Sequence, residues 1–320
     1  MTTRHIRRKQ GGFTLLELLV TVGIMAAVAG TATLALQDTT ARASAAAHVL
    51  MMDELNEGIM TFRALPTNNS YPNNFDSLLE TGGTDTTAAI PFNRLGAAVS
   101  NTTDGIGDLT PFVLTADIAG ALADVGITNL RYVNTALTAN TDGTGGGPLD
   151  TAGIACAQTQ ALINSRQNAV VAGNIFLSPD ANGCGFSSAA LAAGDDVMIW
   201  SGGNERVMGS GVPEPVFDDT TATLDAAGSP DGAEIMMVVG AGPSSNLFDA
   251  SEVGGLSSVP VYRHVARDEY NRFFILFHIA TVTGGVAASV DQVVISAVVD
   301  GAGDTKEEEL GEWDGTRNTI

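Results

Sequence analysis

Two acidic segments with interspersed glycines are the part of this sequence best suited to holding a metal ion. Residues 104–108 (DGIGD) and 300–304 (DGAGD) share the pattern DGxGD. Carboxylates separated by glycines can wrap a hard cation such as calcium, with backbone carbonyls as further ligands. Neither segment follows the twelve-residue EF-hand loop, and Asp and Gly also suit solvated turns. Calcium at Asp300 and Asp304 is therefore a candidate site, and an ordinary turn is the alternative. No other cofactor is indicated.

The remaining reactive side chains show no spacing typical of a catalytic site. The sequence contains no GxSxG nucleophile elbow, no zinc-binding HExxH and no phosphate-binding loop. The histidines are scattered, only the last two could meet across strands, and a core or surface role explains each of them: His5, His48, His264 and His278. We therefore predict that the protein is not an enzyme.

The two cysteines, Cys156 and Cys184, are not spaced as CxxC, so neither a redox pair nor a metal knuckle is indicated. They are either two buried thiols or a disulfide. Oxidising compartments preserve such bonds, so we predict a disulfide if the domain is exported. Closing this loop would stabilise the fold by roughly 3–4 kcal/mol in the chain-entropy model.

The charge balance argues against one class of partner. The 320 residues include 36 acidic against 15 basic side chains, which gives a net charge of −21. Several of the basic side chains lie in the first twelve residues, so the rest of the chain is more acidic still. Such a domain repels nucleic acid and anionic lipid. We predict no nucleic-acid partner.

The N-terminus combines a basic polar segment with a long apolar one. Residues 1–12 read MTTRHIRRKQGG, and residues 13–37 are apolar with Glu17 as their only charge. About 20 apolar residues can span a bilayer as a helix. The basic residues favour a cytoplasmic N-terminus, with the acidic remainder across the membrane. A secretory signal peptide is the alternative, but its apolar region is usually shorter.

Glu17 is an unusual residue for a membrane segment, because an ionisable group there is costly and needs a partner. Cleavage after Gly12 would expose a positively charged amine on Phe13, close to Glu17 in the chain. In a bundle of staggered copies this carboxylate could neutralise the amine of a neighbouring chain and fix the axial register. The alternative is a carboxylate that reaches the membrane interface.

The basic leader, Gly12 and the following residues FTLLE, from Phe13 to Glu17, resemble the prepilin signature of type IV pilins and type II secretion pseudopilins. The resemblance covers about the first 35 residues. It implies cleavage between Gly12 and Phe13 by an inner-membrane prepilin peptidase, N-methylation of Phe13, and a role for Glu17 in recruitment and register. The implied partners are copies of the chain or related pilins and the inner-membrane assembly machinery.

The chain also departs from the pattern of these families. Many major pilins carry a proline about twenty residues into the mature helix, where this chain has Leu34, and its first proline is Pro66. Minor pilins and pseudopilins are therefore the alternatives to a major pilin. Some pseudopilins hold calcium in a C-terminal loop, which favours the candidate site at residues 300–304.

The helix is expected to continue beyond the membrane. Residues 40–65 are rich in good helix formers, and Pro66 ends the pattern. Apolar residues recur at spacings of three and four and predict one stripe that packs on the globular domain: Ala47, Met51, Leu55, Ile59 and Phe62.

The rest of the chain predicts a β-rich sheet packed on the long helix, and hence an α+β fold. A short amphipathic helix is expected at 115–126. The expected strands lie at 127–133, 169–177, 197–200, 235–239, 272–282 and 292–299. The predicted organisation is a leader at 1–12, a transmembrane or filament-core helix at 13–37, its amphipathic continuation at 38–65 and an extracytoplasmic domain at 66–320, with a weak boundary near 185–195.

These observations favour a structural subunit of a type IV pilus or a type II secretion-like pseudopilus that assembles through its N-terminal helix. The precursor is expected in the inner membrane as a single-pass protein. The mature domain is expected in the periplasm or outside the cell in a filament. The alternatives are a tip-located minor pilin or adhesin that binds a ligand, and an exported enzyme anchored by its helix.

Overall fold

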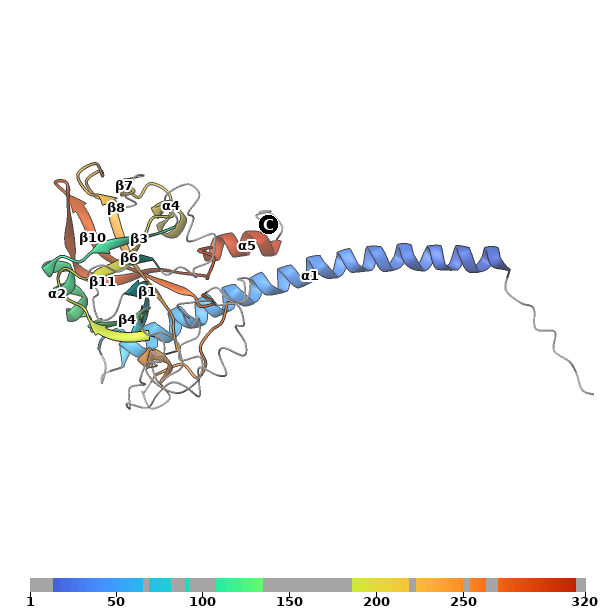
Figure 1. Ribbon diagram of the computed structural model, residues 1–320, viewed down its shortest axis with the longest axis horizontal. Helices are drawn as coiled ribbons and strands as arrows, with labels where there is room; N and C mark the ends of the chain where they lie inside the picture. Colours follow the sequence, from blue (N-terminus) through green and yellow to red (C-terminus); the bar gives the residue numbers. More distant parts are fainter. Residues whose placement is uncertain are drawn as a thin grey trace, which may run out of the picture.

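A long helix projects from a β-rich globular domain (Figure 1). The computed structural model describes residues 14–65, 69–81, 90–91, 108–134, 186–218, 223–243, 245–249, 254–262 and 270–314. The predicted α+β class is confirmed.

Helix α1 (Leu15–Ala64) is a single element of 50 residues, about 75 Å long at 1.5 Å per residue. It begins with a capping box formed by Thr14 and Glu17, which satisfies backbone N–H groups of the first turn. It ends at Leu65, whose backbone is extended, as expected of a residue that precedes proline.

The two halves of α1 have different surroundings. The segment Leu15–Thr33 has a mean hydropathy of 2.0, and none of it is buried. The second half packs against the domain, as the spacing predicts, although Ala47 and Met51 are only half-buried. The buried row is shifted around the helix and consists of Ala45, Val49, Met52, Leu55, Ile59 and Phe62.

One mixed sheet contains most of the strands. Its main path is β11-β10-β9-β1-β4-β5, while β6 pairs with β9 and β3, and β2 pairs with β1. The pairing of β1 with β4 is parallel and the other pairings are antiparallel. The strands are β1 (Phe75–Thr81), β2 (Ile90–Pro91), β3 (Leu109–Val113), β4 (Asn129–Asn134), β5 (Phe186–Ala190), β6 (Asp196–Trp200), β9 (Glu234–Gly240), β10 (Phe274–Thr283) and β11 (Val286–Val299).

Smaller elements complete the described fold. Strands β7 (Val216–Asp218) and β8 (Thr223–Asp225) form a separate two-stranded sheet. Helix α2 (Ala116–Asp124) packs against β11, and helix α5 (Lys306–Asp314) packs beside α1 where α1 leaves the domain (Figure 1). Two short helical turns are α4 (Asn204–Met208) and η1 (Asn246–Phe248).

Most of the predicted elements that fall on described residues appear close to their expected bounds, but β11 is longer than predicted. It begins at Val286 because Gly284 and Gly285, with φ of 59° and 78°, form the tight turn of a β10–β11 hairpin. The predicted strand at 169–177 lies outside the described residues. The weak boundary near 185–195 stays a prediction. Strand β4 precedes it, β5 lies within it, and the two strands pair in the same sheet.

The core of the domain lies between the buried half of α1 and the central strands. Strands β9 and β10 are buried along most of their length. Aromatic rings join the elements: Phe277 of β10 lies 5.2 Å from the ring of Tyr71 and 6.0 Å from that of Phe75. The inner half of α1 contributes its buried row to this core, while its outer half stands free of the domain.

Candidate functional site

The first turn of α1 places Glu17 at the free end of the helix. The backbone N–H of Thr14 donates to Oε2 of Glu17 at 3.1 Å, and the Thr14 hydroxyl donates to the same oxygen at 2.9 Å. In return, the Glu17 N–H donates to the Thr14 hydroxyl oxygen at 3.3 Å. Glu17 therefore caps its own helix in the isolated chain. Gly12 and Phe13, the predicted processing residues, lie outside the described residues.

The helix surface around Glu17 is apolar and exposed. Leu15 is 82 % exposed, Leu16 74 % and Met25 72 %. The segment Leu15–Thr33 would be about 28 Å long, close to the thickness of a bilayer's hydrocarbon core. A continuous apolar surface of this size marks an interaction with lipid or with other protein.

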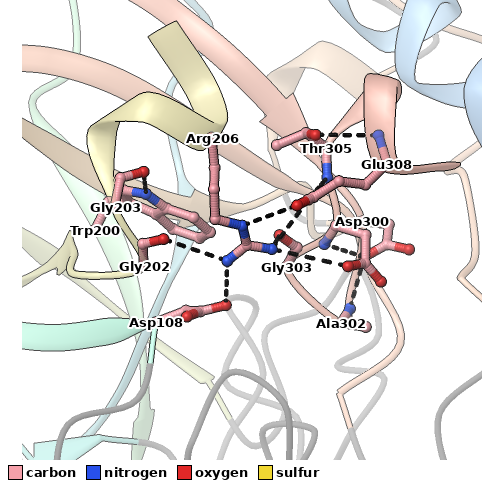
Figure 2. A network of polar contacts seen from close by, with 11 residues as sticks. Asp108, Trp200, Gly202, Gly203, Arg206, Asp300, Ala302, Gly303, Thr305 and Glu308 are labelled. Carbon is pink, nitrogen blue, oxygen red and sulfur yellow. Dashed lines mark hydrogen bonds and ion pairs between the residues drawn. The ribbon is translucent and has the colours of Figure 1, made fainter. Parts of the chain in front are cut away.

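The two acidic segments converge on one arginine, Arg206 of α4 (Figure 2). Its Nη1 lies 3.0 Å from Oδ2 of Asp108, at the end of the first segment. Its Nη2 lies 3.8 Å from Oδ1 of Asp304 and donates to the carbonyl of Gly303 at 3.0 Å, in the second segment. The rest of the first segment lies outside the described residues.

Glu308 completes this junction with two parallel hydrogen bonds. Nε and Nη2 of Arg206 donate to Oε1 and Oε2 of Glu308 at 3.1 and 3.0 Å, the bidentate geometry that suits an arginine–carboxylate pair. Glu308 also caps α5, because its Oε2 accepts from the Thr305 N–H at 2.9 Å and its own N–H donates to the Thr305 hydroxyl. One carboxylate thus links α4 to the start of α5.

Burial sets the electrostatics of the junction. It raises the pKa of Asp108, although the charge of Arg206 opposes this. Burial alone would lower the pKa of Arg206, but the hydrogen bonds to Glu308 and the charge of Asp108 outweigh it and raise that pKa. The guanidinium lies 5.4 Å from the Trp200 ring centre, a cation–π distance. The Arg206 guanidinium therefore keeps its positive charge at the centre of this cluster.

The candidate calcium residues have different partners in the structure. Oδ1 of Asp300 accepts from the N–H groups of Ala302 and Asp304 at 2.8 and 2.9 Å, so it closes its own turn. The carboxylate of Asp304 faces Arg206 instead, where the guanidinium already supplies positive charge. Calcium at Asp300 and Asp304 stays a prediction. So does the disulfide, because Cys156 and Cys184 lie outside the described residues.

Comparison with known proteins bears on the N-terminal segment. A family model described as the prokaryotic N-terminal methylation motif matches residues 7–33. This is the type IV pilin and pseudopilin signature. Comparisons with curated proteins and with solved structures find no significant match. The apolar helix and the motif together fit a membrane-anchored precursor of a pilin-like protein.

A second polar network is buried inside the domain of this pilin-like protein. The Tyr270 hydroxyl donates to Oδ2 of Asp76 at 2.6 Å, and both side chains are fully buried. Burial raises the pKa of Asp76 to about 6, although the hydrogen bond from Tyr270 and the charges of Arg131 and Arg272 oppose this. A Cβ atom at Gly242 would overlap the Asp76 carboxylate, so this close approach requires glycine.

This network predicts a pH dependence of stability. The native protein holds the Asp76 proton more tightly than the unfolded chain, where the pKa is about 3.9. Native stability should therefore fall as the pH rises from about 4 to about 6, by up to ~3 kcal/mol. Urea denaturation at a series of pH values measures this. Asp76→Asn keeps an acceptor for Tyr270 and should make the fall in stability smaller; an unchanged profile in this variant would show that Asp76 is not responsible.

Proposed function

We propose that this pilin-like protein is a structural subunit of a type IV pilus or a type II secretion-like pseudopilus. The observation that carries the proposal is the fully exposed apolar segment Leu15–Thr33, with Glu17 as its only charge, within the matched residues 7–33. An apolar rod of this kind is stable in lipid before assembly and among other rods after it. The proposed role needs no catalytic residue.

Assembly is proposed to begin with removal of the leader. Cleavage after Gly12 leaves an amine on Phe13, one residue before Thr14, whose N–H already contacts the Glu17 carboxylate. In a filament, the Glu17 carboxylate would leave the cap of its own helix and pair with the Phe13 amine of a neighbouring copy. Copies in any other register would leave a charge unpaired in an apolar core, which is strongly unfavourable.

The proposal also covers the orientation of the precursor in the membrane, the packing of its helix and its partners. The basic leader would keep the N-terminus of the precursor in the cytoplasm, and the acidic domain would lie in the periplasm or outside the cell. The helix surface at Gly23 and Gly30 has no neighbour within 4 Å in the isolated chain, so helices of other copies can approach closely there. Partners would be copies of this chain or related pilins, the prepilin peptidase and the assembly machinery of the inner membrane.

The unbroken course of α1 favours a pseudopilin or a minor pilin. No proline interrupts its 50 residues, whereas many major pilins, which this N-terminus resembles, carry one in this region. Immunogold labelling distinguishes a subunit that repeats along the filament from a subunit at its tip. Label along the whole length would indicate a repeating subunit, and label at the tip alone would indicate a minor pilin.

Processing of the N-terminus tests the proposed function. Mass spectrometry of the mature protein should find a chain that begins at Phe13 and carries one added methyl group. Gly12→Val should leave the leader intact, because the cut lies directly after this residue. The matched variant Gly11→Ala should be processed like the wild type. An intact leader on wild-type protein recovered from the membrane would contradict the proposal.

A further inference from the structure

Three side chains from distant parts of the chain meet in the interior beside α1. His48 lies on α1, Asp300 directly follows β11, and Glu309 lies on α5. They are 3 %, 0 % and 3 % exposed. One potential ligand atom from each lies within 4.8 Å of the other two, and Nδ1 of His48 lies 3.1 Å from Oε1 of Glu309.

The Asp300 carboxylate brings one buried oxygen to this cluster that its own turn does not use. Its Oδ1 accepts two backbone hydrogen bonds from its own turn. Its Oδ2 is buried and makes no hydrogen bond of ordinary geometry with the described residues, and the Tyr262 hydroxyl and the Glu309 carboxyl are the groups that face the Asp300 carboxylate. A buried carboxylate oxygen without such a partner is unfavourable unless a cation or a proton neutralises it.

Aromatic rings shield the cluster from solvent. The Tyr262 ring centre lies 4.7 Å from that of His48, with the planes tilted by 53°. Phe273 meets the imidazole edge-on at 6.3 Å. Burial and then the negative charge of Asp300 raise the pKa of Tyr262, so its hydroxyl stays neutral beside the carboxylate. A cation held here would be enclosed by protein, as at a structural metal site.

We propose that His48, Asp300 and Glu309 bind one divalent transition-metal ion of the zinc type and so fasten α1 to the C-terminal part of the domain. One imidazole with two carboxylates suits zinc, whereas calcium prefers oxygen ligands alone. Zinc binds such atoms at about 2.0–2.2 Å, so donors already within 4.8 Å of one another can share an ion after small side-chain shifts.

The consequence is a cross-link at the base of the projecting helix. His48 and Glu309 are 261 positions apart in the chain. They lie on α1 and α5, which pack beside each other where α1 leaves the domain (Figure 1). A bound ion would make the angle between helix and domain depend on metal. This site is independent of leader cleavage and filament assembly, so the two proposals can fail separately.

Metal titration of the purified full-length chain in detergent tests the site. Zn²⁺ should bind at one ion per chain and raise the melting temperature, and Co²⁺ should bind there with visible absorption bands. His48→Gln and Glu309→Gln should each weaken binding by more than about tenfold, the lower range seen when even a group that only hydrogen-bonds to a metal ligand is lost. The control His278→Gln, which changes a histidine of β10 with partners of its own, should bind like the wild type.

Further measurements establish whether the variant folds and which atoms bind the ion. Glu309→Gln retains an acceptor for His48, and circular dichroism establishes whether it folds. X-ray absorption of the zinc-loaded wild type should show one imidazole nitrogen among oxygen ligands. Failure of the wild type to bind Zn²⁺ and Co²⁺ would overturn the proposal. A proton on the Asp300 or Glu309 carboxyl would then neutralise the cluster instead of a metal ion. An all-oxygen shell, or a preference for Ca²⁺ over Zn²⁺, would overturn it as well.

Discussion

Replacing Glu17 with glutamine is expected to abolish filament assembly and to leave the precursor in the membrane. The helix would still insert, because the change removes the only charge of its apolar segment. In a filament, however, the Phe13 amine of each neighbour would lose its counter-charge in a low-dielectric core, which costs several kcal/mol. Since about 1.4 kcal/mol corresponds to a tenfold change, the amount of filament recovered by shearing should fall by far more than tenfold.

Two variants separate the charge of Glu17 from its capping role. Glutamine can replace glutamate in a capping box, so Glu17→Gln keeps the cap and removes the charge. Thr14→Val keeps the charge and removes the cap, at about 1 kcal/mol. We expect Thr14→Val to assemble and Glu17→Gln not to. Normal filaments from Glu17→Gln would show that capping, rather than charge pairing, explains this residue.

Arg206→Met is expected to lower the free energy of unfolding by about 2–4 kcal/mol, because it leaves buried carboxylates without their counter-charge. Arg206, Asp108 and Glu308 have side chains that are 29 %, 22 % and 13 % exposed, so the cluster is only partly screened by solvent. Methionine retains much of the packing volume, which isolates the loss of charge. Denaturant unfolding of the wild type and the variant measures the difference.

An exposed ion pair provides the matched control for this variant. Lys306 contacts Asp53 at 2.6 Å, but the two side chains are 44 % and 54 % exposed. Lys306→Met should therefore cost less than about 1 kcal/mol. The deficit of Arg206→Met should also shrink at acidic pH, where the facing carboxyls become protonated. Equal effects of both variants would show that the Arg206 junction contributes no more than a surface pair.

The elements with strong periodicity were predictable from the sequence. The apolar run and the spacing of Leu55, Ile59 and Phe62 indicate a long helix, because a helix repeats its faces every 3.6 residues. The buried strands β9 and β10 follow from continuous apolar runs. The start of β11 is not predicted because its first residues, VAASVD, mix apolar, small and polar side chains without the regular alternation of a strand. The Gly284-Gly285 turn is the signal that marks the hairpin with β10.

The candidate sites are harder to predict from the sequence than the elements, because most of their residues come together only in the tertiary structure. The capping box of Glu17 follows the T-x-x-E pattern from Thr14 and was readable as a local motif. The convergence of Asp108 and Asp304 on Arg206 was not, because β3 must first pair with β6 and α4 must lie beside the turn after β11. Both acidic segments are recognisable in the sequence, but no local pattern points to the arginine that lies between them.

The structure of the assembled filament decides whether Glu17 pairs with the Phe13 amine of a neighbouring copy. We expect the Glu17 carboxylate of one copy to lie within about 4 Å, the ion-pair distance, of the Phe13 amine of a neighbouring copy. We also expect the hydrogen bond from Thr14 of the same chain to be weakened or replaced. A filament in which Glu17 still caps only its own helix, with the neighbour's amine paired elsewhere, would show that Glu17 does not set the register between copies.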